Sequence, residues 1–286
     1  MYGQKYNLAK KSFEINRRKF SAGICALSLP FGDVRALAKS GVNNFNASGA
    51  TALSGHRFRS GEENCVIANI ISPENDALLN NARQFSRMSR NMLQSILDKD
   101  NYVIEYTGEV TRWGDKVVRL PSLRAKANSL QEDLIVRGAA RVMPINSDYD
   151  EINTLLALEE KARNEQKGLW ALSWYRMRDA NNVNDARDCI GSQQIFSGRI
   201  VGVGKFGGRW FLNFGDDYKT DVTATIDSRA ARQWSKFWSI EAGDLKTLEG
   251  QMVSFRGFVE WINGPSVAVS HSLCLIPKCI DGQLCA

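Results

Sequence analysis

The chain has 286 residues, of which 43% are hydrophobic and 24% are charged. This composition is ordinary for a globular protein, and the length allows two modest hydrophobic cores. No apolar run approaches the ~20 residues that a membrane-spanning helix needs, which excludes a multi-span helical membrane protein.

The net charge of +6 is concentrated at the N-terminus. Residues 1–38 contain seven Lys or Arg residues and two acidic residues, a net charge of +5, which leaves +1 for residues 39–286. A nearly neutral remainder gives no evidence for a polyanionic partner, although a neutral surface can still carry a basic stripe.

Residues 1–38 resemble a twin-arginine export signal. Arg17 and Arg18 precede a mildly apolar stretch at 21–30, and the Ala-Leu-Ala sequence at 36–38 fits the small-residue rule of signal peptidase. The sequence therefore predicts a bacterial protein exported to the periplasm or beyond, without a transmembrane span after signal cleavage. The alternative is a disordered basic tail with a chance Arg-Arg pair.

Export would place the cysteines in an oxidising compartment. Cys279 and Cys285 flank a short Asp-Gly turn and are the candidate disulfide, although Cys189 or Cys274 could pair instead. A zinc site built from Cys274, Cys279, Cys285 and His271 matches no tight ligand spacing, so no metal site is predicted.

The region 53–170 alternates strand and helix patterns with turn residues between them. The expected elements are two strands around a turn within 53–71, a helix at 76–99, a strand at 102–110, a helix at 129–137, an extended segment at 139–143 and a helix at 149–166.

Three segments of this region resemble the staphylococcal nuclease (thermonuclease) family. I-I-S-P-E at 70–74 is similar to the family's I-D-x-P-E, and L-I-V-R-G-A-A-R-V at 134–142 is similar to L-V-x-x-G-x-A-x-V. E-E-K-A-R followed by K-G-L-W, within 159–170, is similar to the family's third motif. The resemblance implies a five-stranded barrel of the oligonucleotide/oligosaccharide-binding (OB) kind with packed helices, over residues 39–175.

The family's chemistry implies a calcium ion held by carboxylates and two arginines on the scissile phosphate. His56 stands in the segment that aligns with the D-G-D-T metal turn, and Ile71 replaces the aspartate before the Pro-Glu pair. Val66 and Asp115 replace the two arginines, and only Glu74 matches. The resemblance therefore implies a nuclease domain that has lost its catalytic residues and needs no cofactor.

A relocated active site is the alternative, and it would need Ca²⁺. Four arginines lie close in sequence to the lost positions, namely Arg57, Arg59, Arg112 and Arg119. Arg57, Arg59 and Arg112 are the candidate binding residues, while Glu62 and Glu63 could offer oxygen ligands. The competing interpretation of these arginines is a solvated surface.

Residues 176–189 are rich in Asn, Asp and Arg with little periodicity, which predicts a linker. Strand patterns follow at 194–203, 209–214, 220–226, 251–261 and 266–270, with a helix at 228–238 between the third and fourth strands. This order predicts a second OB-like barrel at 190–278, followed by a tail at 279–286.

The second region also carries a family resemblance. W-F-L-N-F-G at 210–215 and T-D-V-T-A-T-I at 220–226 resemble the barrel that is appended to some bacterial thermonuclease-family proteins. Trp210 and Phe214 are candidate base-stacking residues, although core packing is the more common role of such aromatics.

The sequence therefore predicts an α+β fold, mainly β, with two consecutive five-stranded OB-like barrels, the first with packed helices. The predicted function is that of a catalytically inactive thermonuclease-family protein, an exported binding or assembly subunit with a protein partner in the cell envelope. The alternatives are a calcium-dependent nuclease with a relocated site and a non-catalytic single-stranded nucleic-acid-binding protein.

Overall fold

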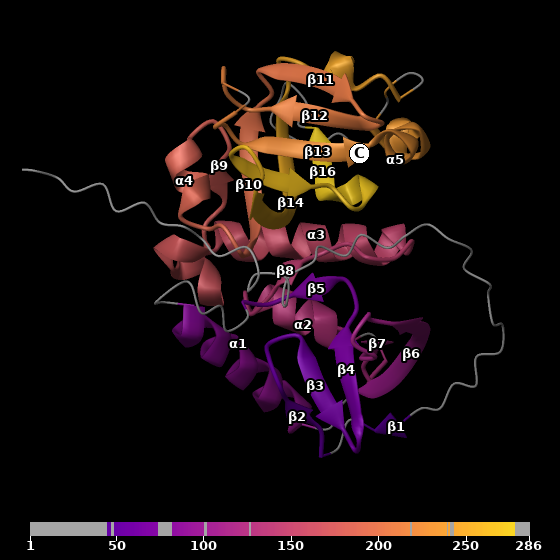
Figure 1. Cartoon of the computed structure of the whole chain (residues 1–286). Coiled ribbons are helices and arrows are strands. Elements are labelled where there is room, and N and C mark those ends of the chain that lie inside the picture. Colours follow the sequence, from indigo (N-terminus) through magenta and orange to yellow (C-terminus); the bar gives the residue numbers. More distant parts are fainter. Residues whose placement is uncertain are drawn as a thin grey trace, which may run out of the picture.

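The computed structural model describes residues 45–46, 49–73, 82–99, 102–125, 127–217, 219–238, 240 and 243–277. The expected export signal at 1–38, Glu74, Cys279 and Cys285 lie outside the described residues. In the described part the fold is mixed α+β and mainly strands, as the sequence predicts, and it forms two halves with one long helix between them (Figure 1).

The first half contains a mixed sheet flanked by helices. Its strands are β1 (Phe45–Asn46), β2 (Thr51–Ala52), β3 (Arg57–Ser60), β4 (Glu63–Ile67), β5 (Ile70–Ile71), β6 (Val103–Val110), β7 (Lys116–Arg119) and β8 (Arg141–Val142). Its helices are α1 (Ala82–Leu97), α2 (Leu130–Val136) and α3 (Tyr149–Asn164), followed by the short 3-10 helices η1 (Gly168–Ala171) and η2 (Ser173–Tyr175).

The main sheet of this half has the strand order β1-β6-β7-β4-β3-β2, and β5 pairs with β8 in a separate two-stranded sheet. Inward-facing side chains such as Phe58, Ile67, Ile104 and Val118 form one core with the apolar faces of the helices. At the start of α2, Ser129 and Glu132 form a capping box, in which each side chain satisfies the other residue's backbone N–H.

The second half is built on a larger sheet. Its strands are β9 (Arg178–Asp179), β10 (Gln193–Arg199), β11 (Gly202–Phe206), β12 (Arg209–Asn213), β13 (Thr223–Asp227), β14 (Met252–Trp261), β15 (Pro265–Ala268) and β16 (Leu275–Pro277). Its helices are α4 (Val183–Arg187), α5 (Ser228–Trp234) and the 3-10 helices η3 (Ser235–Trp238), η5 (Leu245–Leu248) and η6 (Ser272–Cys274).

The larger sheet has the order β11-β12-β13-β15-β14-β10-β9, and β16 pairs with β14. β11, at one end of this order, is close in sequence to β10, the last strand before β9 at the other end, because only Ile200 and Val201 separate them. Val201 donates a backbone hydrogen bond to Asn213 of β12, and Ile200 donates one to Gln251 beside β14. In the part of the chain that the structure describes, neither half forms a closed hydrogen-bonded barrel, so that part of the fold prediction is not confirmed.

The predicted linker at 176–189 contains regular structure. It forms β9, which pairs with β10, and α4, which Asn182 caps. Arg176 binds both oxygens of Asp185 at 2.7 and 2.8 Å, and the buried Arg178 donates to the same carboxylate at 2.9 Å. The Asn, Asp and Arg residues that suggest an irregular linker in the sequence are caps and ion-pair partners in the structure.

Helix α3 lies between the two halves (Figure 1). Glu159 of α3 is 1% exposed, and its carboxylate accepts hydrogen bonds at 3.2 and 2.9 Å from Arg256 of β14, which also donates to the carbonyl of Val142. Arg141 of β8 donates to the carbonyl of Gln193 at the start of β10. Buried charges therefore join α3 and β8 of the first half to β10 and β14 of the second.

Cys65, Cys189 and Cys274 are buried free thiols. Burial raises the pKa of each to about 11, so these residues behave as small apolar side chains rather than reactive thiolates. Among the described residues, no helix is both long and apolar enough to cross a membrane.

Candidate functional site

Strand pairing brings together the positions that align with the family's catalytic residues. Arg57 lies opposite Val66 in the β3–β4 hairpin, and Val66 lies opposite Val117 of β7. Asp115 directly precedes β7, and Ile71 ends β5. The β3–β4 hairpin and β7 therefore bring Val66 and Asp115 together on the main sheet. Ile71 lies on the separate β5–β8 sheet, and its neighbour Ser72 contacts His56 at 2.9 Å.

Asp115, at one of these positions, forms an ion pair with the neighbouring Arg57. Arg57 Nη2 lies 2.6 Å from Asp115 Oδ2, and the Asp115 side chain is 5% exposed whereas that of Arg57 is 33% exposed. The carboxylate at the position of the family's second arginine is thus held by the guanidinium that follows His56. One terminal nitrogen of Arg57 is therefore engaged by this buried carboxylate, which compensates the charge of the guanidinium.

His56 occupies the metal-turn position and is buried in a neutral polar network. Its Nδ1 lies 2.9 Å from Ser72 Oγ and 3.3 Å from Ser54 Oγ, and it accepts a hydrogen bond from the Ser72 N–H at 3.2 Å. Burial, with a smaller contribution from the charge of Arg57, lowers the pKa of His56 from 6.5 to about 3. The imidazole is therefore neutral at physiological pH.

The turn around His56 packs tightly against α1. A Cβ atom on Gly55 would lie 1.7 Å from Ser89 Oγ and 2.6 Å from the Cβ of Ser72, so this position accepts only glycine. The Ser89 hydroxyl in turn donates to the carbonyl of Ala139 at 2.5 Å. These contacts fill the space beside the histidine with protein atoms.

Oxygen ligands for a cation are lacking at these positions. Asp115 is the only described acidic residue among them, and Arg57 engages it. Glu63 pairs with Lys116 and accepts a hydrogen bond from Tyr106 at 3.3 Å, at the opposite end of the β3–β4 hairpin from Arg57. Within the described residues, no group of three or more His, Cys, Asp or Glu side chains could hold a metal ion. The described residues at these positions do not fit a calcium ion.

Residues 64–172 match the family model for staphylococcal nuclease homologues. This part of the chain is a staphylococcal-nuclease-like domain. The match runs from β4 to the end of η1, and His56 and Arg57 precede it. No curated protein matches the chain.

The other candidate binding residues are dispersed over the two halves. Arg59 is exposed and donates to Asn64 at 3.1 Å, whereas Arg112 stacks over the exposed ring of Trp113 at 4.1 Å. Trp210 is 5% exposed and lines a hollow in the second half. Phe214 is 1% exposed and stacks on Phe255, so it is a core residue and not a ligand-stacking one.

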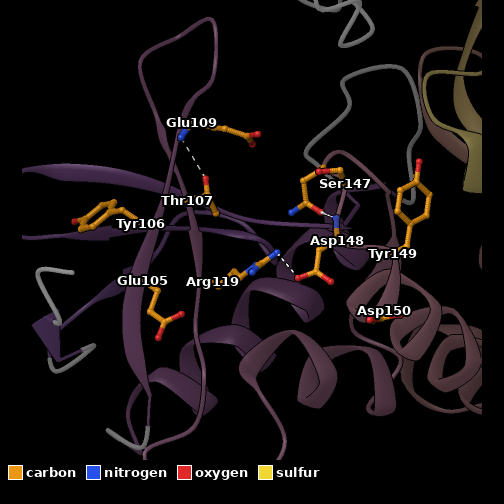
Figure 2. Close-up of a pocket in the computed structure, with 10 residues that line it drawn as sticks. Glu105, Tyr106, Thr107, Glu109, Arg119, Ser147, Asp148, Tyr149 and Asp150 are labelled. Carbon is orange, nitrogen blue, oxygen red and sulfur yellow. Dashed lines mark hydrogen bonds and ion pairs between the residues drawn. The ribbon is translucent and has the colours of Figure 1, made fainter. Parts of the chain in front are cut away.

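The nuclease-like domain carries an open groove of about 640 Å³ elsewhere on its surface (Figure 2). β6 lines one side, Arg119 of β7 lies at the centre, and the segment 146–150 before and at the start of α3 lines the other side. Arg119 points to Asp148, whose Oδ2 accepts its hydrogen bond at 2.8 Å (Figure 2). Its Nε lies 3.3 Å from Glu151, so both ends of this guanidinium face carboxylates.

The groove is acidic. Four carboxylates line it against the single guanidinium of Arg119, and they belong to Glu105, Glu109, Asp148 and Asp150. β6 also has an open edge here, because β1 pairs only with Ile104 and Val103, and no described strand covers the outer edge from Glu105 onward. This surface repels polyanions and fits a ligand with basic groups.

The groove is absent from the expectations drawn from the sequence, although one signal for it exists. Glu105, Thr107 and Glu109 alternate along the predicted strand at 102–110, and alternate residues share one face of a strand. Asp148 immediately precedes the predicted helix start, where an N-cap is expected, and its side chain accepts from the Glu151 N–H. The partnership between this cap and Arg119 cannot be seen in the sequence.

We expect His56 to make the stability of the fold depend on pH. Its pKa is lower in the folded state than in the unfolded chain, so below pH 6.5 the unfolded chain takes up a proton that the folded state excludes. This contribution is fully present above pH 6.5 and is lost as the pH falls toward 3. Between pH 7 and 4.5 it corresponds to about 2–3 kcal/mol.

Urea unfolding of the wild type and of the His56→Asn variant at pH 7 and 4.5 tests this expectation. The variant should lose less unfolding free energy over this interval than the wild type, even if it is less stable at both pH values. An equal loss in both proteins would show that His56 is not a buried neutral imidazole.

Proposed function

We propose that this protein is a catalytically inactive relative of the thermonucleases that works as an exported binding or assembly subunit. The observation that carries the proposal is the Arg57–Asp115 ion pair beside the buried His56. Where the family resemblance implies a metal ion and two phosphate-binding arginines, this chain has a neutral imidazole and an internally compensated charge pair. This arrangement supports a protein that keeps the nuclease-like fold but does not hydrolyse phosphodiesters.

The acidic groove supports a protein partner over a nucleic acid. Its carboxylates would lie close to the phosphates of a bound strand, and that repulsion costs binding free energy. An extended segment with Lys or Arg residues suits both the charge of the groove and the open edge of β6, to which a peptide can add as a further strand. The proposed partner is therefore a protein of the cell envelope that presents such a segment.

Fluorescence anisotropy and cleavage assays on the full chain test this function. The probes are labelled single-stranded DNA, single-stranded RNA and an extended Lys/Arg-rich peptide, each with calcium and with chelator. We expect no cleavage, no nucleic-acid binding, and peptide binding that Asp150→Lys weakens roughly tenfold while Glu62→Lys, an exposed carboxylate outside the groove, does not.

Each contrary outcome in these assays points to a specific alternative. Calcium-dependent cleavage that Glu74→Gln abolishes would overturn the inactive assignment and support a relocated site. Nucleic-acid binding without cleavage would favour the single-stranded nucleic-acid-binding alternative. Equal weakening of peptide binding by Asp150→Lys and Glu62→Lys would remove the groove from the proposal.

The finer architecture of the second half is also a proposal. We infer an OB-like barrel at 190–278, in which β10 and β11 are the two parts of one bent first strand. The order β11-β12-β13-β15-β14-β10, with α5 after the third strand, supports this reading. A crystal structure in which the chain at Ile200 and Val201 left a gap between β12 and β14 would contradict it.

Export through the twin-arginine pathway is the proposed route to the envelope. In a bacterium that has this pathway, the full chain should appear in the periplasm, shortened by about 38 residues. The Arg17→Lys/Arg18→Lys variant should remain in the cytoplasm at full length. Fractionation followed by mass spectrometry measures both results, and a cytoplasmic wild type would rule out export.

A further inference from the structure

A second hollow, of about 430 Å³, lies in the other half of the molecule. Three segments surround it: the β11–β12 hairpin, helix α5, and the loop that leads into η5. None of these segments contributes to the positions aligned with the family's active site or to the acidic groove. The hollow is therefore spatially separate from both of these features.

The side chains around this hollow are predominantly cationic. Lys205 of β11, Arg232 of α5 and Lys246 of η5 all line it and are exposed. The only acidic residue in the lining is Asp244, whose carboxylate caps η5 by accepting the Lys246 N–H at 3.1 Å. Among the described residues, no ion pair links any of the three cations to a carboxylate.

One of these cations is held in place by an aromatic ring. Lys205 lies directly opposite Trp210 in the β11–β12 hairpin, and its Nζ lies 4.7 Å from the centre of the indole ring. Trp210 is 5% exposed, so its position is fixed by the core beneath it. The contact orders the lysine at the edge of the hollow without neutralising its charge.

The opposite wall is shaped by close packing. Gly243 has a φ of +71°, and a Cβ atom there would lie 2.9 Å from the Cα of Arg232. Only glycine fits at this position. Because glycine has no side chain, the loop before η5 can approach α5 closely. The hollow is thus built into the fold and does not depend on a ligand to form.

A buried hydroxyl group beside the hollow lacks a hydrogen-bond partner in the described part of the chain, which independently points to a bound ligand. Ser228 is 7% exposed and lines the hollow, and its Oγ has no hydrogen-bond partner among the described residues. A buried hydroxyl without a partner costs free energy, and a bound ligand or water can satisfy it.

We infer that this hollow is a binding site for the phosphate or pyrophosphate group of a small molecule. Three cations around one space repel each other, and a multiply charged anion converts that repulsion into attraction. Arg232 supplies the forked donor geometry that suits phosphate oxygens, and Lys205 and Lys246 add point charges. The volume exceeds that of one phosphate, which leaves room for the rest of a phosphorylated ligand.

Isothermal titration calorimetry of the full chain with inorganic pyrophosphate tests this inference. We expect saturable binding that weakens as salt is raised, and that falls roughly tenfold in Arg232→Gln. The matched control is Arg229→Gln, since Arg229 is an exposed arginine of the same helix that does not line the hollow. Lys205→Gln should weaken binding as well, and thermal unfolding checks that each variant is folded.

The outcomes separate a specific site from general cationic attraction. Binding lost in Arg232→Gln and Lys205→Gln but unchanged within about twofold in Arg229→Gln supports the inference. Absence of pyrophosphate binding, or equal weakening in all three variants, overturns it. A single-stranded oligonucleotide that competes with pyrophosphate would assign the phosphates to a nucleic-acid backbone and contradict the small-molecule assignment.

Discussion

The arrangement of this molecule depends on the buried ion pair between Glu159 and Arg256. Removing one member of such a pair leaves a charge in a low-dielectric interior, at a cost of about 3–5 kcal/mol, so the two residues hold each other in place. Because Arg256 also binds the carbonyl of Val142, one guanidinium fixes β14 against both α3 and β8. The groove at the start of α3 and the hollow beside α5 therefore belong to one framework.

A second ion pair, between Arg57 and Asp115, is the basis of the proposed function. Asp115 would be unfavourable beside a bound phosphate and expensive to bury alone, but Arg57 resolves both difficulties by pairing with it. The neutral His56 and the close contact of Gly55 with Ser89 complete a compact polar cluster. The face that aligns with the family's active site thus contributes to the stability of the fold, while the acidic groove and the cationic hollow lie elsewhere on the molecule.

Much of the secondary structure could be predicted from local patterns. The strongly periodic segments, such as α3 and β14, lie within a few residues of their expected bounds. Pairings between distant residues could not be predicted: β5 with β8, and Glu159 with Arg256, which are 97 positions apart. The sequence shows His56 and Asp115 at positions where the family resemblance implies functional residues, but the partnership of Asp115 with Arg57 appears only when β3, β4 and β7 are adjacent.

We propose that the nuclease-like domain does not hold the calcium ion that its family resemblance implies. Calorimetric titration of the full chain with calcium tests it most directly, because metal binding precedes any cleavage or substrate effect. We expect only the heat of dilution up to millimolar calcium. Saturable binding of about one ion, lost in Glu74→Gln or Glu63→Gln, would contradict it and show that a working metal site has been rebuilt.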